Sequence, residues 1–163
     1  MGSCPARSGD LRRPLLLLDV DGVLQPVGRS VPPGFERFTT EGLGVVLSAR
    51  HGLWLNERTG IFEIVGATTW GAAANAAIGS RLGLPDLAHI DLGPLPRGGT
   101  RKLTAVQHFV GARPVAWVDD ELYEDAASWA AERPAPTMLR RTAASVGLTH
   151  ADVLALAEFG SRL

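Results

Sequence analysis

Two aspartates one residue apart follow the first strongly apolar stretch of this chain. Asp19 and Asp21 stand in the motif LLLLDVDGVL, directly after four leucines. Alternate residues of an extended segment point the same way, so the two carboxylates can act on one target. A cation would offset the repulsion between carboxylates placed so closely, and their oxygens suit Mg²⁺. The motif therefore indicates a site that binds a cation and handles an anionic group.

The motif DVDG is also compatible with two simpler structural roles. The first is a surface turn, which Asp and Gly favour. The second is half of a calcium-binding loop. An EF-hand loop, however, needs an oxygen ligand where Val23 stands, and a helix where the apolar run precedes the motif. The calcium loop is therefore disfavoured, whereas the turn stays open on this motif alone.

Further polar residues follow the later apolar runs. The segment GATTW contains Thr68 and Thr69, TRKLTAV contains Lys102, and VDDE contains Asp119 and Asp120. Taken singly, the threonines are more typical of a helix cap, and the acids of a helix N-terminus. A lysine at a helix start is slightly unfavourable because the helix dipole repels it, unless an anion lies opposite. The order of these residues along the chain is therefore more informative than any one of them.

The elements that must position these residues alternate between strands and helices. Apolar runs predict strands over 15–20, 61–65, 87–92, 114–118 and 136–140. Helical patterns follow over 49–58, 71–83, 101–111, 122–133 and 150–160. Ser48 and Thr149 can cap two of these helices, and Gly83 can end a third. The segments 35–40 and 43–48 predict a hairpin.

This alternation predicts an α/β fold. We expect a mainly parallel five-stranded sheet with helices on both faces and a small β-hairpin flap over about 25–47. Ligands of such sheets bind beyond the carboxyl ends of the strands. The acids, the threonines and the lysine should therefore meet at one edge of the sheet.

The composition is that of an ordinary globular chain. It has 163 residues, of which 45% are hydrophobic and 20% charged, and a formal net charge of -1. We expect one domain over 14–163 after a flexible N-terminal tail at 1–13, with no overall basic field for nucleic acid. The lone Cys4 excludes an intramolecular disulfide, and no apolar run is long enough to cross a bilayer. These features predict a cytoplasmic protein without a membrane partner, and they leave the oligomeric state open.

At the motifs above, the chain resembles the haloacid dehalogenase (HAD) superfamily of phosphohydrolases. The matching segments are LLDVDGVL, EIVGATTW, TRKLTAV and AWVDDE, in the order of the four motifs of that superfamily. More narrowly, DVDGVL, ATTW and AWVDD are similar to HAD modules of multidomain RNA-repair proteins. The resemblance implies a three-layer, Rossmann-like HAD fold.

The resemblance also implies a role for each matched residue. Asp19 would be the nucleophile, passing through an aspartyl-phosphate, and Asp21 the general acid and then the base. The metal, Mg²⁺, would be held by Asp19, the backbone carbonyl of Asp21 and Asp119, with Asp120 orienting its waters. Lys102 and Thr68 would bind the phosphoryl oxygens, although Thr69 stays open as the alternative to Thr68.

The implied activity is a Mg²⁺-dependent phosphatase acting on a phosphomonoester. Asp21 favours phosphate over halide chemistry, since a dehalogenase needs no acid two residues after its nucleophile. The short intervals from Asp19 to Thr68 and from Thr68 to Lys102 leave no room for a large cap domain. An open site suits a large substrate, such as a nucleic-acid end or a phosphoprotein, or else a partner that supplies the lid, and a nucleotide or polynucleotide phosphate is the plausible substrate. Trp70 either stacks on a base there or packs in the core. The alternatives are a non-catalytic HAD-fold module that binds phosphate or Mg²⁺, and a phosphotransferase that uses the same residues.

Overall fold

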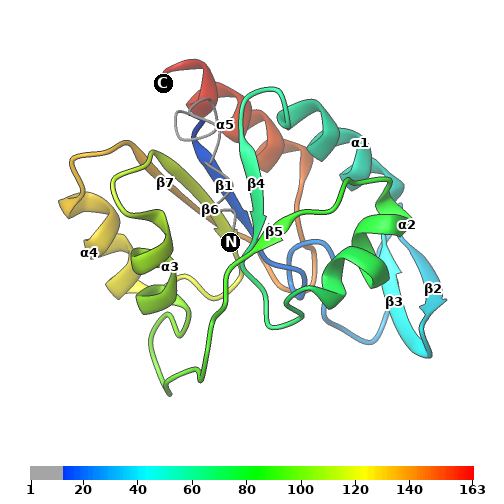
Figure 1. Cartoon of the computed structure of the whole chain (residues 1–163). Helices are drawn as coiled ribbons and strands as arrows, with labels where there is room; N and C mark the ends of the chain where they lie inside the picture. The colour runs from blue at the N-terminus through cyan, green and yellow to red at the C-terminus, as the bar shows by residue number, and fades with distance from the viewer. Residues whose placement is uncertain (1–12) are drawn as a thin grey trace, which may run out of the picture.

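The structure, a computed structural model, describes residues 13–163 and is built around one parallel sheet. Its strand order is β5-β4-β1-β6-β7, with β1 at the centre (Figure 1). The five strands are β1 (Leu15–Leu18), β4 (Glu63–Gly66), β5 (Ala88–His89), β6 (Val115–Asp119) and β7 (Thr137–Arg141). This arrangement confirms the predicted Rossmann-like α/β fold.

Helices cover both faces of the sheet. Successive side chains of β1 point to opposite faces, so its leucines are divided between two cores. Leu16 and Leu18 pack in one core cluster, and Leu15 and Leu17 pack in another, all almost completely buried. The first cluster contains residues of α1 (Ala49–Arg58), α2 (Ser80–Leu82) and α5 (His150–Ser161). The second contains residues of α3 (Leu103–Val110) and α4 (Glu124–Glu132). The continuous apolar runs of the strands therefore reflect burial on two sides.

Two strands end earlier than the sequence predicts. The first strand was expected over 15–20, but β1 ends at Leu18, since the carbonyl of Val20 accepts hydrogen bonds from the amides of Val23, Leu24 and Gln25. That tight loop turns the chain at the carboxyl end of the sheet. The third strand was expected over 87–92, but β5 has only two residues, which pair with Val65 and Gly66 at the sheet edge.

The helix predicted over 71–83 is present over 73–82, but its middle turn is a π-helix. The first two helical residues lead into this turn, η2 (Asn75–Gly79), which continues into the short α2. The side chain of Asn75 donates to the carbonyl of Leu87 at 3.0 Å and accepts from its amide at 2.9 Å, which ties the start of η2 to the segment before β5. As predicted, Gly83 ends the helix, in the left-handed conformation with φ of 68°.

The predicted hairpin is present as β2 (Glu36–Thr40) and β3 (Leu43–Leu47), paired antiparallel. Val45 and Leu47 are buried in the core that α1 and α5 cover, so one side of the hairpin packs on the domain. Helix α1 begins after Ser48 as expected, although the Ser48 side chain makes no capping hydrogen bond. Thr149 does cap α5, in a capping box with Asp152.

The N-terminal end of the described range is attached to the sheet. Residues 1–12 of the predicted tail lie outside the described residues, as does Cys4. Arg13 belonged to that predicted tail, but its carbonyl accepts a hydrogen bond from Arg113 at 2.6 Å. Within residues 13–163, no helix has the length and apolar character that crossing a bilayer requires.

Candidate active site

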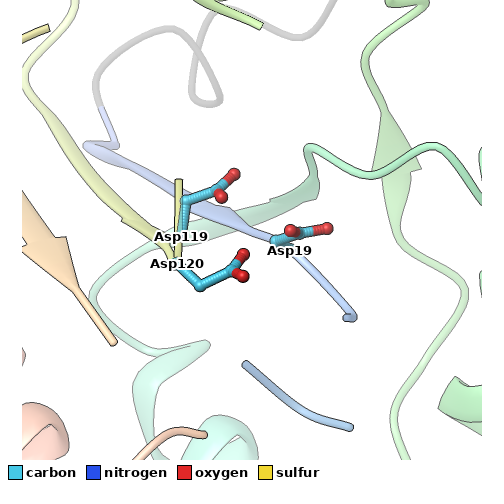
Figure 2. Close-up of side chains that lie close together, drawn as sticks. All are labelled: Asp19, Asp119 and Asp120. Carbon is cyan, nitrogen blue, oxygen red and sulfur yellow. The ribbon is translucent and has the colours of Figure 1, made fainter. Parts of the chain in front are cut away.

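Three aspartates meet at the carboxyl end of the two central strands (Figure 2). Leu18 pairs with Val118 in the β1–β6 register, so the next residues, Asp19 and Asp119, lie side by side. Asp120 follows β6 directly. One carboxylate oxygen from each of the three aspartates lies within 4.8 Å of the others. The strand register thus brings together acids that are far apart in the sequence.

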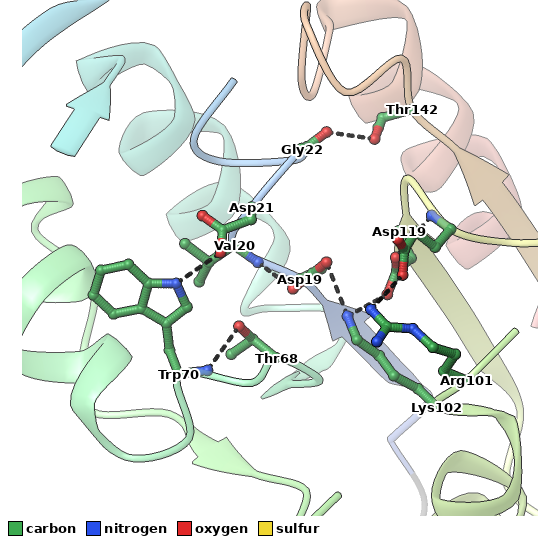
Figure 3. A network of polar contacts seen from close by, with 11 residues as sticks. Asp19, Val20, Asp21, Gly22, Thr68, Trp70, Arg101, Lys102, Asp119 and Thr142 are labelled. Carbon is green, nitrogen blue, oxygen red and sulfur yellow. Dashed lines mark hydrogen bonds and ion pairs between the residues drawn. The ribbon is translucent and has the colours of Figure 1, made fainter. Parts of the chain in front are cut away.

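Lys102 bridges two of these carboxylates (Figure 3). Its Nζ lies 2.8 Å from Oδ2 of Asp19 and 2.7 Å from Oδ2 of Asp119. All three residues are buried, with exposed fractions of 7% for Lys102, 6% for Asp19 and 1% for Asp119. Lys102 occupies the N-cap position of α3, where the helix dipole disfavours a cation. The two carboxylates opposite it supply the anion that this position calls for.

The remaining oxygens of these carboxylates accept backbone hydrogen bonds. Oδ1 of Asp19 accepts from the amide of Val20 at 2.7 Å, and Oδ1 of Asp119 accepts from the amide of Glu121 at 3.0 Å. Each carboxylate is therefore held at one oxygen by the backbone and at the other by Lys102. Such fixed geometry is what an attacking or metal-binding group requires.

The site carries more negative charge than one ammonium can balance. Burial raises the pKa of Asp19 to about 7, the charge of Asp119 adds to the rise, and Lys102 opposes it. Burial and Asp119 also raise the pKa of Asp120. For Lys102, burial disfavours the charged form, but Asp119 and Asp19 outweigh it and raise the pKa. The lysine is therefore an ammonium, and the acids need a further positive charge to ionise together.

A Mg²⁺ ion fits this donor set. The three clustered side chains offer only hard carboxylate oxygens, which this cation prefers, and the surplus negative charge would be offset by it. The Asp21 side chain is not part of the cluster. Its predicted contribution to the metal, through the backbone carbonyl, stays a prediction.

The loop that carries Lys102 is anchored to the start of α4. Both the amide and the hydroxyl of Thr100 donate to the Asp125 carboxylate, the hydroxyl at 2.6 Å. The same hydroxyl accepts from the amide of Tyr123 at 2.9 Å. Gly99 allows the close approach, because a Cβ there would lie 2.7 Å from Oδ2 of Asp125. These hydrogen bonds from Thr100 lower the pKa of Asp125, so the anchor carries a charge.

Asp120 lies against the loop that follows β1. A Cβ on Gly22 would be 2.4 Å from Cγ of Asp120, and Gly22 has a φ of 79°. The carbonyl of Gly22 accepts from the buried hydroxyl of Thr142 at 2.7 Å, and the carbonyl of Asp120 accepts from Nε of Arg141 at 3.1 Å. The end of β7 therefore supports both segments that carry the acids.

Of the two candidate threonines, Thr68 is the one directed into the structure. Thr68 is 2% exposed, and its hydroxyl accepts from the amide of Trp70 at 3.2 Å, while Thr69 is exposed. Leu18 pairs with Gly66, so the loop after β4 emerges next to Asp19 (Figure 3). An open hollow of about 380 Å³ borders Thr68 and Thr69 and leads away past His89. The structure thus places Thr68 beside the nucleophile candidate, at the wall of an accessible hollow.

The sequence did not indicate the surroundings of Asp21. Its Oδ1 accepts from Nε2 of Gln25 at 2.9 Å, and its Oδ2 accepts from Nε1 of Trp70 at 3.1 Å. Trp70 was expected to stack on a base or to pack in the core. Its ring does pack against the core, but its N–H is directed at Asp21. A tryptophan two residues after the candidate threonine was the available signal, and Gln25 offered none.

Comparison with known families agrees with this geometry. A family described as "HAD domain in Swiss Army Knife RNA repair proteins" matches residues 15–153. The match begins at the first residue of β1 and ends within α5, so it includes all the strands of the parallel sheet and all six of the predicted site residues. No match was found among curated proteins.

Proposed function

The chain belongs to the family of HAD domains found in Swiss Army Knife RNA repair proteins, and on this basis we propose that it is a Mg²⁺-dependent phosphomonoesterase. The coarser part of this conclusion, a phosphoryl-transfer function, follows from the family. The finer part rests mainly on one observation. A buried ammonium holds the Asp19 carboxylate at 2.8 Å, next to a cluster of acids that suits a divalent cation.

In the proposed reaction, Asp19 attacks the phosphorus of a phosphomonoester. A bond forms between a carboxylate oxygen of Asp19 and phosphorus as the bond to the leaving oxygen breaks. Asp21 gives its proton to that leaving oxygen, so the alcohol departs neutral. Water then attacks the aspartyl-phosphate, Asp21 takes a proton from it, and inorganic phosphate leaves as the Asp19 carboxylate is restored.

The other residues would stabilise the charge of the phosphoryl group. Lys102 supplies a fixed ammonium, and the Thr68 hydroxyl supplies a donor from the neighbouring strand. Asp19, the carbonyl of Asp21 and Asp119 would hold Mg²⁺, with Asp120 beside it. When bound, the cation supplies charge neutralisation for the phosphoryl oxygens and for the clustered carboxylates.

The substrate we propose is the phosphorylated end of a polynucleotide, or a nucleotide. Between β1 and β4 the described chain contains the hairpin and α1, which leaves hollows open beside Thr68 and beside Asp120, the second of about 550 Å³. An open site admits a substrate too large for a capped one. The RNA-repair context in the description of the family favours a nucleic-acid end among such substrates.

Phosphate release from an aryl phosphate and from 3′- and 5′-phosphorylated oligonucleotides tests this proposal. We expect turnover with Mg²⁺, none with EDTA, and a loss of about 10³-fold or more in Asp19→Asn. The Asp86→Asn variant is a suitable control, since Asp86 is an exposed acid outside the carboxylate cluster and outside the hollow beside Thr68. If no ester is hydrolysed, the non-catalytic binding module becomes the better interpretation. Transfer of the phosphoryl group to an added alcohol in place of water would favour the phosphotransferase.

A further inference from the structure

Both oxygens of the Asp21 carboxylate are engaged by side chains from different parts of the chain. Gln25 donates to Oδ1 at 2.9 Å and Trp70 donates to Oδ2 at 3.1 Å (Figure 3 shows the Trp70 contact). A carboxylate offers about four lone-pair positions, so two remain for other partners. Two donors on different oxygens fix the plane of the group. The Asp21 carboxylate is therefore held in one orientation and can still accept further hydrogen bonds.

Trp70 connects Asp21 to the loop that follows β4. The indole N–H is a donor only, and it is directed at Asp21, while the ring is partly buried against the core. The backbone amide of the same residue donates to the hydroxyl of Thr68. One residue thus fixes the positions of the predicted acid and the predicted phosphate-binding hydroxyl relative to each other.

Gln25 connects Asp21 to the hairpin. Its Nε2 donates to Asp21, and its Oε1 accepts from the backbone amide of Val46 in β3 at 3.0 Å. If the Gln25 amide were turned by 180°, its oxygen would face the Asp21 carboxylate and its NH₂ group would face the N–H of Val46. The two partners therefore determine the orientation of the amide. The backbone of Gln25 is held as well, because its carbonyl accepts a hydrogen bond from the amide of Gly22 and its amide donates to the carbonyl of Val20.

These contacts differ in kind from those of the neighbouring acids. Asp19 and Asp119 face the Lys102 ammonium, whereas the two side-chain donors to Asp21 are neutral. The contacts to Asp21 therefore orient its carboxyl group without placing a charge beside it.

We propose that Trp70 and Gln25 are positioning residues, which hold the Asp21 carboxyl in place for proton transfer to the leaving-group oxygen. This inference rests on the proposed function and adds to it the groups that orient its acid. It also makes β3 part of the site, through Val46 and Gln25. Neither residue is expected to touch the phosphoryl group.

The test compares two esters that differ in their need for an acid. The leaving group of 4-nitrophenyl phosphate departs as a stabilised anion, whereas an alkyl ester expels an alkoxide that must be protonated. The alkyl ester should be whichever of glycerol 2-phosphate, a 3′- and a 5′-phosphorylated oligonucleotide the unsubstituted protein cleaves fastest. The ratio kcat/KM is the appropriate quantity, because it reports the steps through leaving-group departure and excludes the later attack of water.

Two variants remove the contacts with little change of shape. Trp70→Phe keeps an aromatic ring without the N–H, and Gln25→Met keeps the length of the side chain without donor or acceptor. We expect kcat/KM for the alkyl ester to fall about 10- to 100-fold in each, and kcat/KM for the aryl ester to stay within about threefold. In an Asp21→Asn background, neither substitution should lower alkyl-ester cleavage further, since the acid it positions is gone.

Matched controls separate positioning from general packing. Trp54→Phe makes the same ring change on α1, and Gln107→Met makes the same amide change at an exposed position of α3. Both should leave the kcat/KM of the two esters unchanged. Two variants from different elements also protect the test against one of them failing to fold.

Several outcomes would overturn the inference alone. These are equal losses on the two esters, no loss on either, a further loss in the Asp21→Asn background, or aryl-ester cleavage without any alkyl-ester cleavage by the unsubstituted protein. Absence of phosphate release from every ester by the unsubstituted protein would instead overturn the proposed function, and the inference with it. The failures of the two proposals are therefore distinguishable.

Discussion

The ammonium of Lys102 and the carboxylate of Asp119 form a buried ion pair, with Nζ 2.7 Å from Oδ2. The same ammonium lies 2.8 Å from Asp19, and Lys102 is the only lysine of the 163-residue sequence. Without metal, one positive charge therefore balances two buried carboxylates, with Asp120 nearby. The stability of the metal-free protein should depend strongly on this single side chain.

Replacing Lys102 by Met tests that dependence. The substitution leaves Asp19 and Asp119 buried with no cation between them, so the free energy of unfolding in EDTA should fall by about 3–5 kcal/mol. Urea unfolding measures it. The matched control is Arg101→Met, which removes the exposed ion pair with Glu121 and should change stability by less than about 1 kcal/mol. Similar losses in the two variants would contradict the prediction.

A second prediction concerns the close approach of Asp120 to Gly22. A methyl group at Gly22 would overlap Cγ of Asp120 at 2.4 Å and displace that carboxylate. In Gly22→Ala we therefore expect the affinity for Mg²⁺, measured by calorimetric titration, to fall about 10- to 100-fold. The matched control is Gly42→Ala, because Gly42 has the same φ of 79° but has open space around it. The control variant should retain Mg²⁺ affinity, and a loss there equal to that in Gly22→Ala would assign the effect to backbone strain.

Much of this arrangement was predictable because it follows from strand order and burial. The runs ending at Asp19 and Asp119 are apolar throughout, which is typical of strands covered on both faces, and parallel strands place their carboxyl ends together. The sequence also indicated that a lysine at a helix start would be unfavourable unless an anion lay opposite, and the ion pairs of Lys102 with Asp19 and Asp119 agree with that condition. These inferences depend on residue type and on the alternation of strands and helices, both of which are read directly from the chain.

The remaining features depend on contacts between distant side chains. The hydrogen bond between Trp70 and Asp21 joins residues 49 positions apart, and that between Gln25 and Val46 joins residues 21 apart. No periodicity encodes such pairs. The π-helical turn that begins at Asn75 was missed for a similar reason, since the side chain of Asn75 pairs with Leu87 outside the helix. Local propensity predicts a helix there, but it does not predict the wider turn.

A third prediction concerns the anchor of the loop that carries Lys102. In Thr100→Val the Asp125 carboxylate loses its hydroxyl donor and the amide of Tyr123 loses its acceptor, at a position only 4% exposed. The free energy of unfolding should fall by about 1–3 kcal/mol, measured by urea unfolding. The kcat/KM for phosphate release should fall as well, because Lys102 lies two residues further on. The control is Thr104→Val, the same change at an exposed position of α3; equal effects at the two threonines would exclude the anchor role.

The last prediction concerns a buried histidine outside the site. His51 is 1% exposed, and its Nε2 donates to the carbonyl of Leu148 at 2.9 Å. Burial lowers the pKa of His51 below its ordinary value of 6.5, and the hydrogen bond to the carbonyl of Leu148 opposes this only in part. The guanidinium-bearing Arg50 borders the same hollow as His51. The folded protein therefore holds His51 neutral at pH values where the unfolded chain already binds a proton.

The sign of the pH dependence follows from this difference. As the pH falls below about 6.5, the unfolded state takes up a proton that the folded state does not, so stability decreases by at most about 1.4 kcal/mol per pH unit from this group. Urea unfolding at pH 7.5 and 5.5 should therefore show a smaller decrease for His51→Gln than for the unsubstituted protein, because glutamine cannot take up that proton. The carboxylates of the active site titrate equally in both proteins, and their contribution cancels in the comparison. The control is His108→Gln, which replaces an exposed imidazole on α3 and should keep the pH dependence of the unsubstituted protein. If His51→Gln also kept the pH dependence of the unsubstituted protein, His51 would be protonated in the folded state and the prediction would be wrong.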